Sequence, residues 1–241
     1  MLKPIVKRLI NNIGYDLVRL KKQKIPEKPF NVLKFVVDRV LQSDPEFYFV
    51  QIGANDGLRA DPIRPLVMQY HLRGLLVEPM PDIFKELKAN YASEPQLSFE
   101  NCAIGNRDGL TSLYRFMRDT PVPNDFFHGL ARNDKEYMVN RAKSLGLLKY
   151  IEELHVPTLT FSSLLKKHEV KNLSLLQVDT EGYDFEILKM LFSYSIFPQI
   201  INYEWSELSY DDRRECKLML LDKGYSFIDC GSDTLCLLHD S

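Results

Sequence analysis

Apolar and polar positions along this chain follow two alternating patterns. Short unbroken apolar runs, at residues 47–52 and 74–77, indicate buried strands. Between such runs, apolar residues recur every three or four positions, as at residues 32–41 and 81–91, and this spacing predicts helices. Strands and helices that alternate in this way are typical of crossover units in a parallel sheet. The pattern therefore predicts an α/β fold.

The same alternation continues to the end of the chain. Further strands are expected at residues 97–104, 110–116, 156–161, 173–178 and 199–203. Further helices are expected at residues 61–71, 134–154, 162–168, 182–192 and 209–222. The last two expected strands, residues 225–229 and 234–238, flank the turn sequence CGSD, which favours an antiparallel hairpin.

Residues 117–155 interrupt this alternation. Their first part, MRDTPVPNDFFHGLARND, is rich in proline, aspartate and asparagine and shows no clean period. An insertion of this length in a compact domain is more often a binding loop or lid than filler. We therefore expect this segment to act as a lid that selects the substrate.

Length and composition place the chain among ordinary globular proteins. Its 241 residues are enough for one α/β domain with a full core, and 45% of them are hydrophobic and 27% charged. No apolar run approaches the ~18 residues of a membrane span. None of the cysteines forms a Cys-x-x-Cys pair or has a histidine at zinc-site spacing. These features predict a cytoplasmic protein with reduced cysteines.

Positive charge is concentrated at the N-terminus. Residues 1–28 contain eight lysine or arginine residues and two acidic ones, so they carry +6 while the remainder carries −8. Five apolar residues of this segment fall at helical spacing: Leu2, Ile5, Leu9, Ile13 and Leu17. Such a helix docks on an anionic membrane surface or a partner, or packs on its own domain, and both interpretations remain open. Two following prolines divide the chain into an extension, residues 1–29, and a domain, residues 30–241.

The residues that end the expected strands carry most of the chemical information, because open parallel sheets bind ligands at the carboxyl ends of their strands. Acidic or amide side chains follow every such strand. The sequences concerned are GANDG at residues 53–57, EP at 78–79, NCAI at 101–104, DTEG at 179–182 and YEW at 203–205.

Glu78 and the glycine turn before it predict an adenosine-containing ligand. An acid at the tip of the second strand, 21 positions after Gly57, is placed to accept from both ribose hydroxyls, as in proteins that bind NAD or S-adenosylmethionine. Gly53 and Gly57 enclose Asn55 and Asp56, whereas a diphosphate requires bare N–H groups. An aspartate there repels a diphosphate and attracts an ammonium group, so the turn favours S-adenosylmethionine. A simple strand–helix turn is the alternative, and it leaves Glu78 without a role.

Four motifs resemble those of the FkbM-type methyltransferases: FVQIGANDG, LLVEP, CAIGN and, most specifically, LLQVDTEGYDFEIL. The resemblance extends over residues 47–238. It implies a class I methyltransferase fold, with a mostly parallel seven-stranded sheet, helices on both faces and an antiparallel final strand. It also implies S-adenosylmethionine-dependent O-methylation of a sugar, glycan or secondary metabolite. One departure is Gln51, which replaces the acid common before the first glycine, so a carboxylate contact is missing.

The strand-end motifs give a set of expected cofactor contacts. These are Gln51, Gly53, Asn55, Asp56, Gly57, Glu78, Pro79, Asn101, Ala103, Ile104 and Asp179. The cofactor implied is S-adenosylmethionine.

Three acids are expected to converge beside the methyl group: Asp179, Glu181 and Glu204. Three interpretations of them remain open. Asp179 is the general base, or Asp179 and Glu204 hold a Mg²⁺ ion that acidifies the acceptor hydroxyl, or Asp179 caps the helix that follows it.

Four further residues are candidates for acceptor binding: Phe127, His128, Tyr203 and Trp205. The histidine lies in the insertion and is equally consistent with a loop residue of no function. The two aromatic residues that flank Glu204 are equally consistent with core packing.

Two classes of function follow from these observations. The first is a methyltransferase whose acceptor is a small molecule or glycan, with no nucleic acid as partner. The second is a catalytically silent S-adenosylmethionine-fold module that acts within a larger assembly, and Gln51 keeps it open. An NAD-dependent oxidoreductase ranks third, and oligomers are compatible with each function.

Overall fold

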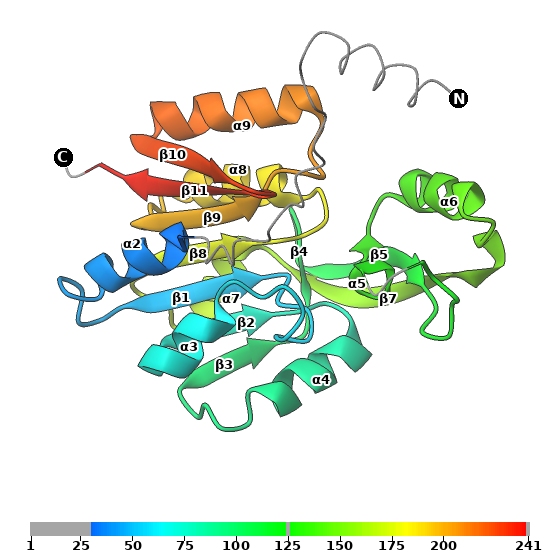
Figure 1. Cartoon of the computed structure of the whole chain (residues 1–241), viewed down its shortest axis with the longest axis horizontal. Coiled ribbons are helices and arrows are strands. Elements are labelled where there is room, and N and C mark those ends of the chain that lie inside the picture. The colour runs from blue at the N-terminus through cyan, green and yellow to red at the C-terminus, as the bar shows by residue number, and fades with distance from the viewer. Residues whose placement is uncertain (1–29, 124–125, 240–241) are drawn as a thin grey trace, which may run out of the picture. The chain divides into compact units, whose positions relative to one another are not determined.

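A seven-stranded sheet organises the computed structural model, which describes residues 30–123 and 126–239 (Figure 1). The expected basic helix at residues 1–28 lies outside the described residues. The strand order is β10-β11-β9-β8-β1-β2-β3. The strands, in that order, are Tyr225–Cys230, Asp233–Leu238, Ile200–Glu204, Leu175–Val178, Tyr48–Ile52, Arg73–Val77 and Leu97–Glu100.

The mostly parallel seven-stranded sheet with an antiparallel final strand, which the resemblance implies, is confirmed. Strands β1, β2, β3, β8 and β9 run parallel, and β11 runs antiparallel to both β9 and β10. The first strand lies inside the sheet, between β8 and β2, so the chain reverses its direction of winding between β1 and β8. The carboxyl ends of these two strands therefore border the crevice where doubly wound sheets bind ligands.

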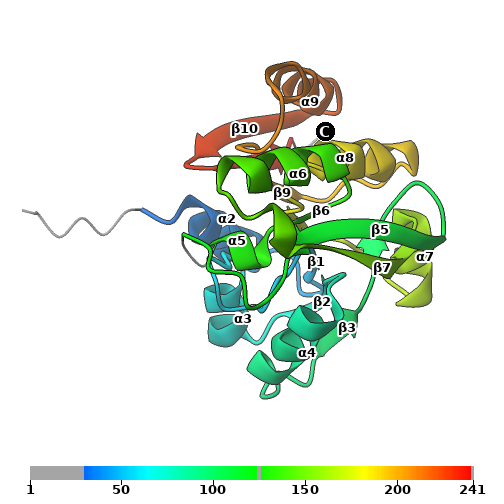
Figure 2. The ribbon, with the colours of Figure 1, turned by 90° about the vertical axis from the view of Figure 1, so that its right-hand side faces the viewer.

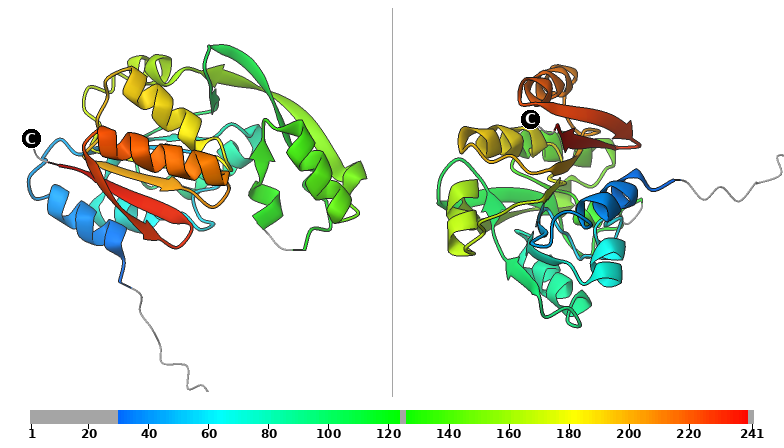
Figure 3. Two further views of the ribbon diagram at one scale, coloured as in Figure 1. Left: turned by 90° about the horizontal axis from the view of Figure 1, so that it is seen from above. Right: turned by 90° about the vertical axis from the view of Figure 1, so that its left-hand side faces the viewer.

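Successive residues of a strand point to opposite faces of the sheet, and here the residues on both faces are apolar. Helices therefore cover both faces. Val50 and Ile52 of β1 face a core formed with α7 (Phe161–Lys167), α8 (Asp184–Ser193) and α9 (Tyr210–Asp222). Phe49 faces a second core with α2 (Val32–Val40) and α3 (Arg64–Tyr70). The two groups of helices lie on opposite sides of the sheet in Figure 3.

A smaller four-stranded sheet extends away from the main one in Figure 1 and faces the viewer in Figure 2. Its order is β4 (Ala103–Ile104), β7 (Ile151–Leu159), β5 (Gly109–Phe116) and β6 (Ala131–Arg132). The short helix α5 (Phe126–Gly129), α6 (Lys135–Ser144) and a 3₁₀ turn (Leu148–Tyr150) lie between β5 and β7 along the chain. Buried apolar residues of these elements form a core of their own.

Three sequence predictions were wrong in this region. Residues 97–104 form two strands in different sheets, and residues 110–116 and 156–159 pair antiparallel outside the main sheet. Residues 151–154 are strand rather than helix. Leu154 and Val156 lie two positions apart, so both point to the same face of a strand, where they pack in one apolar cluster. The strand is also paired with β5 over eight residues.

Ion pairs attach the smaller sheet to α4 (Pro81–Asn90). Arg115 of β5 is 7% exposed and donates to Asp82 at 2.8 Å and 3.0 Å and to Glu152 at 2.8 Å. Arg118 donates to Asp82 and Glu86. Because Arg115 is buried and bidentate, this contact fixes the orientation of β5.

Candidate functional site

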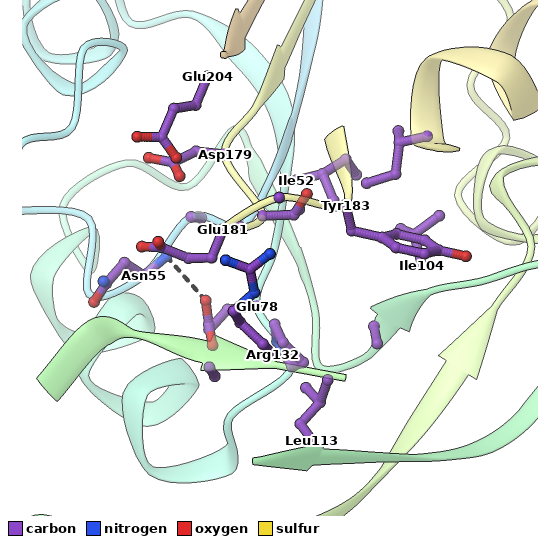
Figure 4. Close-up of a pocket in the computed structure, with 18 of the residues that line it drawn as sticks. Ile52, Asn55, Glu78, Ile104, Leu113, Arg132, Asp179, Glu181, Tyr183 and Glu204 are labelled. Atoms are coloured by element: carbon purple, nitrogen blue, oxygen red, sulfur yellow. Dashed lines mark hydrogen bonds between the residues drawn. The ribbon is translucent and has the colours of Figure 1, made fainter. Parts of the chain in front are cut away.

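A cavity of about 830 Å³ lies along the carboxyl ends of β1, β2, β8 and β9. The β5 and β6 strands of the smaller sheet contribute its opposite wall through Leu113, Ala131 and Arg132 (Figure 4). Its volume is within the range of small-molecule sites, roughly 300–1,000 Å³.

Gly53 allows β1 and β8 to approach each other at the floor of this cavity. Its φ of +79° favours glycine, and a Cβ atom there would lie 1.7 Å from the carbonyl oxygen of Asp179. The Gly53 N–H donates to the Val77 carbonyl at 3.0 Å, which ties the turn to β2. The turn therefore needs glycine for both its conformation and the space it leaves.

Glu78 is held at the centre of the cavity by the backbone. Its two carboxylate oxygens accept from the N–H groups of Asn55 at 3.0 Å and Met80 at 2.9 Å. Burial raises the pKa of Glu78 to about 7, because only 5% of the residue is exposed. Asn101 supports it from behind by donating to the Glu78 and Pro79 carbonyls. The carboxylate is thus fixed where it can accept from two ligand hydroxyls.

Asp56 serves the turn itself. Its Oδ1 accepts from the N–H groups of Leu58 and Arg59, both at 2.9 Å, and the residue does not line the cavity. The expected attraction of Asp56 for a ligand ammonium group is therefore absent from this arrangement. Gly57 and Asn101 also lie outside the cavity wall, whereas the other expected cofactor residues line it.

An apolar wall forms one end of the cavity. It consists of Ile104 and Leu113, which come from the smaller sheet, and of Tyr183 and Ile187, which come from the start of α8. Figure 4 shows Ile104 and Tyr183 to the right of Glu78 and Leu113 below it. A flat aromatic base is the kind of group that such a wall accommodates.

Carboxyl groups crowd the other end. Asp179 follows β8 and Glu204 ends β9, and their carboxyl groups face each other in Figure 4. Burial, and then the mutual repulsion of the two acids, raises the pKa of Asp179; burial also raises the pKa of Glu204. Burial and the Glu204 charge raise the pKa of Glu181 to about 8. The three expected catalytic acids therefore do converge, and the pKa of each is raised.

The capping interpretation of Asp179 is wrong. Helix α8 begins at Asp184, and it is Asp184 that accepts from the Thr180 hydroxyl at 2.9 Å and from the Gly182 N–H at 3.3 Å. Burial raises the pKa of Asp184 to about 6. The turn is therefore stabilised by Asp184, and Asp179 is left free of that role.

The expected acceptor residues do not line the cavity. Phe127 is buried in the core of the smaller sheet, with its ring 5.8 Å from that of Phe116. Tyr203 is fully buried in the main core. Trp205 lies under the guanidinium of Arg213, and His128 is half-buried beside the core of the smaller sheet.

Arg132, which sequence analysis missed, also lines the cavity. It donates to Glu207 at 3.1 Å and lies 3.9 Å from the ring centre of Tyr137, whose hydroxyl also donates to Glu207 at 3.0 Å. Gly182, with φ of +103°, leaves space for it, because a Cβ there would lie 2.2 Å from Arg132 Nη2. The sequence gives no signal for this role of Arg132, because the residue belongs to no motif. Arg132 reaches the cavity only because β6 folds next to it.

Several polar atoms of the cavity wall are buried and have no hydrogen-bond partner among the described residues. They are Gln51 Oε1, Thr158 Oγ1, Glu181 Oε2 and Glu204 Oε2. Buried polar atoms are normally paired, so this set indicates a polar ligand with several N–H or O–H groups.

The described part of the chain contains neither a grouped metal site nor a membrane-spanning helix. Over residues 30–123 and 126–239, no three or more His, Cys, Asp or Glu side chains are grouped so that they could hold a metal ion. Within the same ranges, no helix is long and apolar enough to cross a membrane.

Comparison with known proteins gives a family match. The model of the methyltransferase FkbM domain matches residues 51–227. No curated protein matches the chain. Among solved structures, the chain is similar to the N-terminal domain of human METTL16 in complex with SAH, with 12% identity, 98% of this chain and 82% of that chain covered, and a TM-score of 0.45. It is also similar to methyltransferase FkbM from Methylobacillus flagellatus KT, with 10% identity and a TM-score of 0.46. That match covers 79% of this chain and 43% of the other chain.

Proposed function

This chain belongs to the FkbM family of methyltransferases, and we propose that it transfers a methyl group from S-adenosylmethionine to a hydroxyl group of a sugar, glycan or secondary metabolite. The family match covers residues 51–227 of 241, so the chain is an S-adenosylmethionine-dependent methyltransferase. The acceptor and the roles of individual residues are the proposal.

The residues of the cavity fit the cofactor. Glu78 accepts from the ribose hydroxyls, and the apolar wall of Ile104, Leu113, Tyr183 and Ile187 takes the adenine. The carboxyl groups at the other end stabilise the positive charge of the sulfonium. When bound, S-adenosylmethionine supplies a methyl group already activated for displacement.

The facing pair of Asp179 and Glu204 carries the proposal for catalysis. Burial raises the pKa of both acids, and the Glu204 charge raises that of Asp179 further, so the facing pair shares one proton and one of the two carboxyl groups is ionised. That carboxylate accepts the proton of the acceptor hydroxyl as the oxygen attacks. Glu181 hydrogen-bonds a neighbouring hydroxyl through its unpaired Oε2.

A Mg²⁺ ion between Asp179 and Glu204 is the other form of this mechanism. Two facing carboxylates would hold it, and the ion would acidify the acceptor hydroxyl. EDTA separates the two forms, because it abolishes turnover only if the ion is required, and added Mg²⁺ then restores it.

The polar wall around this pair supports a hydroxyl-rich acceptor. Gln177 and Asp233 line the cavity, Asp233 opposite Glu204 across β11 and β9, and amide and carboxylate groups hydrogen-bond neutral hydroxyls well. An anionic acceptor such as RNA would be repelled by the carboxyl groups. We place the enzyme in the cytoplasm, with the basic residues 1–28 as a contact for a membrane surface or a partner.

Methyl-labelled S-adenosylmethionine tests this proposal. The purified protein is incubated with it and with the carbohydrate, small-metabolite and RNA fractions of the source cells, and products are analysed by mass spectrometry. We expect label as a methyl ether in the carbohydrate or metabolite fraction. Label confined to RNA, or to nitrogen or carbon atoms, would overturn the proposed acceptor class.

A further inference from the structure

A row of buried amide side chains crosses the main sheet close to the facing acids. Gln51 of β1, Gln177 of β8 and Asn202 of β9 are register partners on adjacent strands. Their exposed fractions are 3%, 1% and 3%, and we call them the amide row. Buried amides cost stability unless they are hydrogen-bonded, and the proton transfer proposed above uses none of the three.

The amide row lies on the same face of the sheet as the two acids. Gln177 precedes Asp179 by two positions, and the Asp179 N–H continues the pairing of the strand by donating to the Ile52 carbonyl at 3.0 Å. Asn202 likewise precedes Glu204 by two positions in β9. Alternate strand residues share a face, so the row and the acids are roughly 7 Å apart along the strands. A molecule with one hydroxyl at the acids can therefore reach the row with another group.

Asn202 fixes the orientation of the Gln177 amide. Its Nδ2 donates to Gln177 Oε1 at 2.8 Å and to Asp233 Oδ2 at 3.0 Å. Because Asn202 occupies the Gln177 oxygen, the Gln177 NH₂ group must point elsewhere. Among the described residues it donates to the Val178 carbonyl at 3.4 Å, which is longer than a normal N–H···O bond. Gln177 lines the cavity, so at least one of its N–H groups is available to a ligand.

Gln51 offers the complementary atom on the next strand. Its Nε2 donates to Asp61 Oδ1 at 3.2 Å, and Asp61 is itself held by the Ile63 N–H and the Tyr91 hydroxyl. Gln51 Oε1 is buried and has no partner among the described residues. The cavity wall therefore presents a donor from Gln177 and an acceptor from Gln51, side by side and not bonded to each other.

A hydroxyl group satisfies both atoms, because it accepts one hydrogen bond and donates another. An ammonium group only donates and would leave the Gln177 N–H unpaired. A carboxylate or phosphate only accepts and would leave Gln51 Oε1 unpaired. Each unpaired buried group costs about 1–3 kcal/mol, so the two amides select a hydroxyl over either ion.

We propose that Gln177, together with Gln51, binds a second hydroxyl of the acceptor, on the same ring as the hydroxyl that is methylated. Asn202 is the positioning residue that keeps the Gln177 N–H directed at this group. The assignment rests on the proposed function, because it takes the reacting hydroxyl to lie at Asp179 and Glu204. It narrows the acceptor to a ring with at least two free hydroxyls, and it makes Gln177 a specificity-determining residue.

Competition with small ring alcohols tests this assignment on the full chain. Methyl transfer to the carbohydrate or metabolite fraction is measured in the presence of cyclohexanol, 1,2-cyclohexanediol or 1,3-cyclohexanediol. We expect the more effective diol to inhibit at a concentration roughly tenfold lower than cyclohexanol, because its second hydroxyl makes two hydrogen bonds with the amides. Gln177→Met and Asn202→Leu should each reduce this preference to about twofold or less.

Calorimetry with S-adenosylhomocysteine separates this role from a structural one. Both variants should keep the affinity for S-adenosylhomocysteine within about twofold of the unmodified protein, which also shows that they are folded. Gln96→Met is the matched control, because Gln96 donates to Glu94 and does not line the cavity. It should leave the preference for the diol unchanged.

Three results would overturn the inference while leaving the proposed function intact. They are equal inhibition of the unmodified protein by the diols and cyclohexanol, an unchanged preference in Gln177→Met, and a loss of S-adenosylhomocysteine affinity in Gln177→Met as large as the loss of preference. The last result would place the amide at the cofactor. Failure of the unmodified protein to methylate a hydroxyl in any fraction would instead overturn the proposed function, and this inference with it.

Discussion

At the scale of single residues, Glu78 shows how the backbone prepares a side chain for binding. Its carboxylate accepts from two N–H groups, and burial raises its pKa to about 7. Hydrogen bonds from ligand hydroxyls replace the hydrogen bonds to water that the carboxylate loses on burial. A fixed carboxylate therefore binds with little loss of conformational freedom.

We predict that Glu78→Ala weakens the binding of S-adenosylhomocysteine by about 1–3 kcal/mol, because charge-assisted hydrogen bonds to both ribose hydroxyls are lost. Calorimetry measures the change. Glu100→Gln is the control: Glu100 ends the next strand, β3, but pairs with Lys167 and His168 and does not line the cavity. Unchanged affinity in Glu78→Ala would show that the ribose lies elsewhere.

The facing acids give a second prediction at this scale. Asp179→Asn should lower turnover by roughly 10²-fold or more, because the general base is lost, and should leave the affinity for S-adenosylhomocysteine nearly intact. Turnover is measured on the acceptor found with labelled cofactor. Glu204→Gln should give a similar loss, because the two carboxyl groups share one proton. Full turnover in Asp179→Asn would remove Asp179 from the mechanism.

At the scale of elements, the turn between β1 and α3 controls how closely β1 and β8 approach. Gly53 combines a positive φ with a backbone contact that no side chain tolerates. Gly231, between β10 and β11, has a similar φ of +72° but open space around it. Comparing substitutions at these two glycines separates the cost of the left-handed backbone conformation from the cost of a steric clash with the backbone.

We predict that Gly231→Ala costs about 1–2 kcal/mol of unfolding free energy, the cost of a left-handed conformation. Gly53→Ala should cost substantially more, on the order of 4 kcal/mol, because the Asp179 carbonyl must also move. Urea denaturation of both variants measures the difference. An equal loss of unfolding free energy in the two variants would mean that β8 shifts to accommodate the added methyl group without further cost.

The smaller sheet gives the second prediction at this scale. Glu207 accepts from both Arg132 and the Tyr137 hydroxyl, so it connects β6 and α6 to the loop after β9. We expect Glu207→Ala to speed hydrogen exchange in β6 and the first turn of α6, and to leave β5 and β7 unchanged, because Arg115 holds β5 through Asp82. Glu136→Ala, on the exposed side of α6, is the control.

That residues 117–155 act as a lid stays a prediction. The structure assigns part of this segment a stable core, in which Phe127 and Met138 are buried. Motion on acceptor binding would therefore concern the Arg132–Glu207 contact rather than the aromatic residues. Protection of β6 from exchange on addition of acceptor would support a lid of this kind.

At the scale of the whole molecule, buried acids couple stability to pH. Burial raises the pKa values of Glu78, Asp184 and Glu181 to about 7, 6 and 8, and also raises those of Asp179 and Glu204. Between the unfolded values near pH 4 and these folded values, the native state holds more protons than the unfolded state. The free energy of unfolding therefore falls as pH rises through this window.

We predict that the unliganded protein loses stability on the order of several kcal/mol between about pH 5 and pH 8, as measured by urea denaturation. The double variant Asp179→Asn/Glu204→Gln should show a smaller loss, because two of the coupled acids are removed. S-adenosylmethionine should bind more tightly as pH rises in the same range, since its positive charge favours ionised carboxyl groups. Stability that rises with pH would contradict the assignment of these acids as buried and protonated.

Sequence alone determined that β and α elements alternate around a mostly parallel sheet, that the last two strands form an antiparallel hairpin, and which strand-end residues belong to most of the site. This was possible because apolar periodicity is local, and because parallel strands bring their carboxyl ends to one edge whatever their loops do. Gly53, Glu78, Asp179 and Glu204 could be assigned to the cavity for that reason.

Only the tertiary structure decided which polar groups face the ligand and which stabilise the fold. Asp56 and Asp184 have the same sequence signature as ligand-binding acids, but nearby N–H groups occupy them. Arg132 reaches the cavity through a second sheet whose antiparallel pairing joins residues 109–116 to residues 151–158. Such pairing over about 40 positions leaves no periodic signal, because it depends on contacts between segments and not on the spacing within either one.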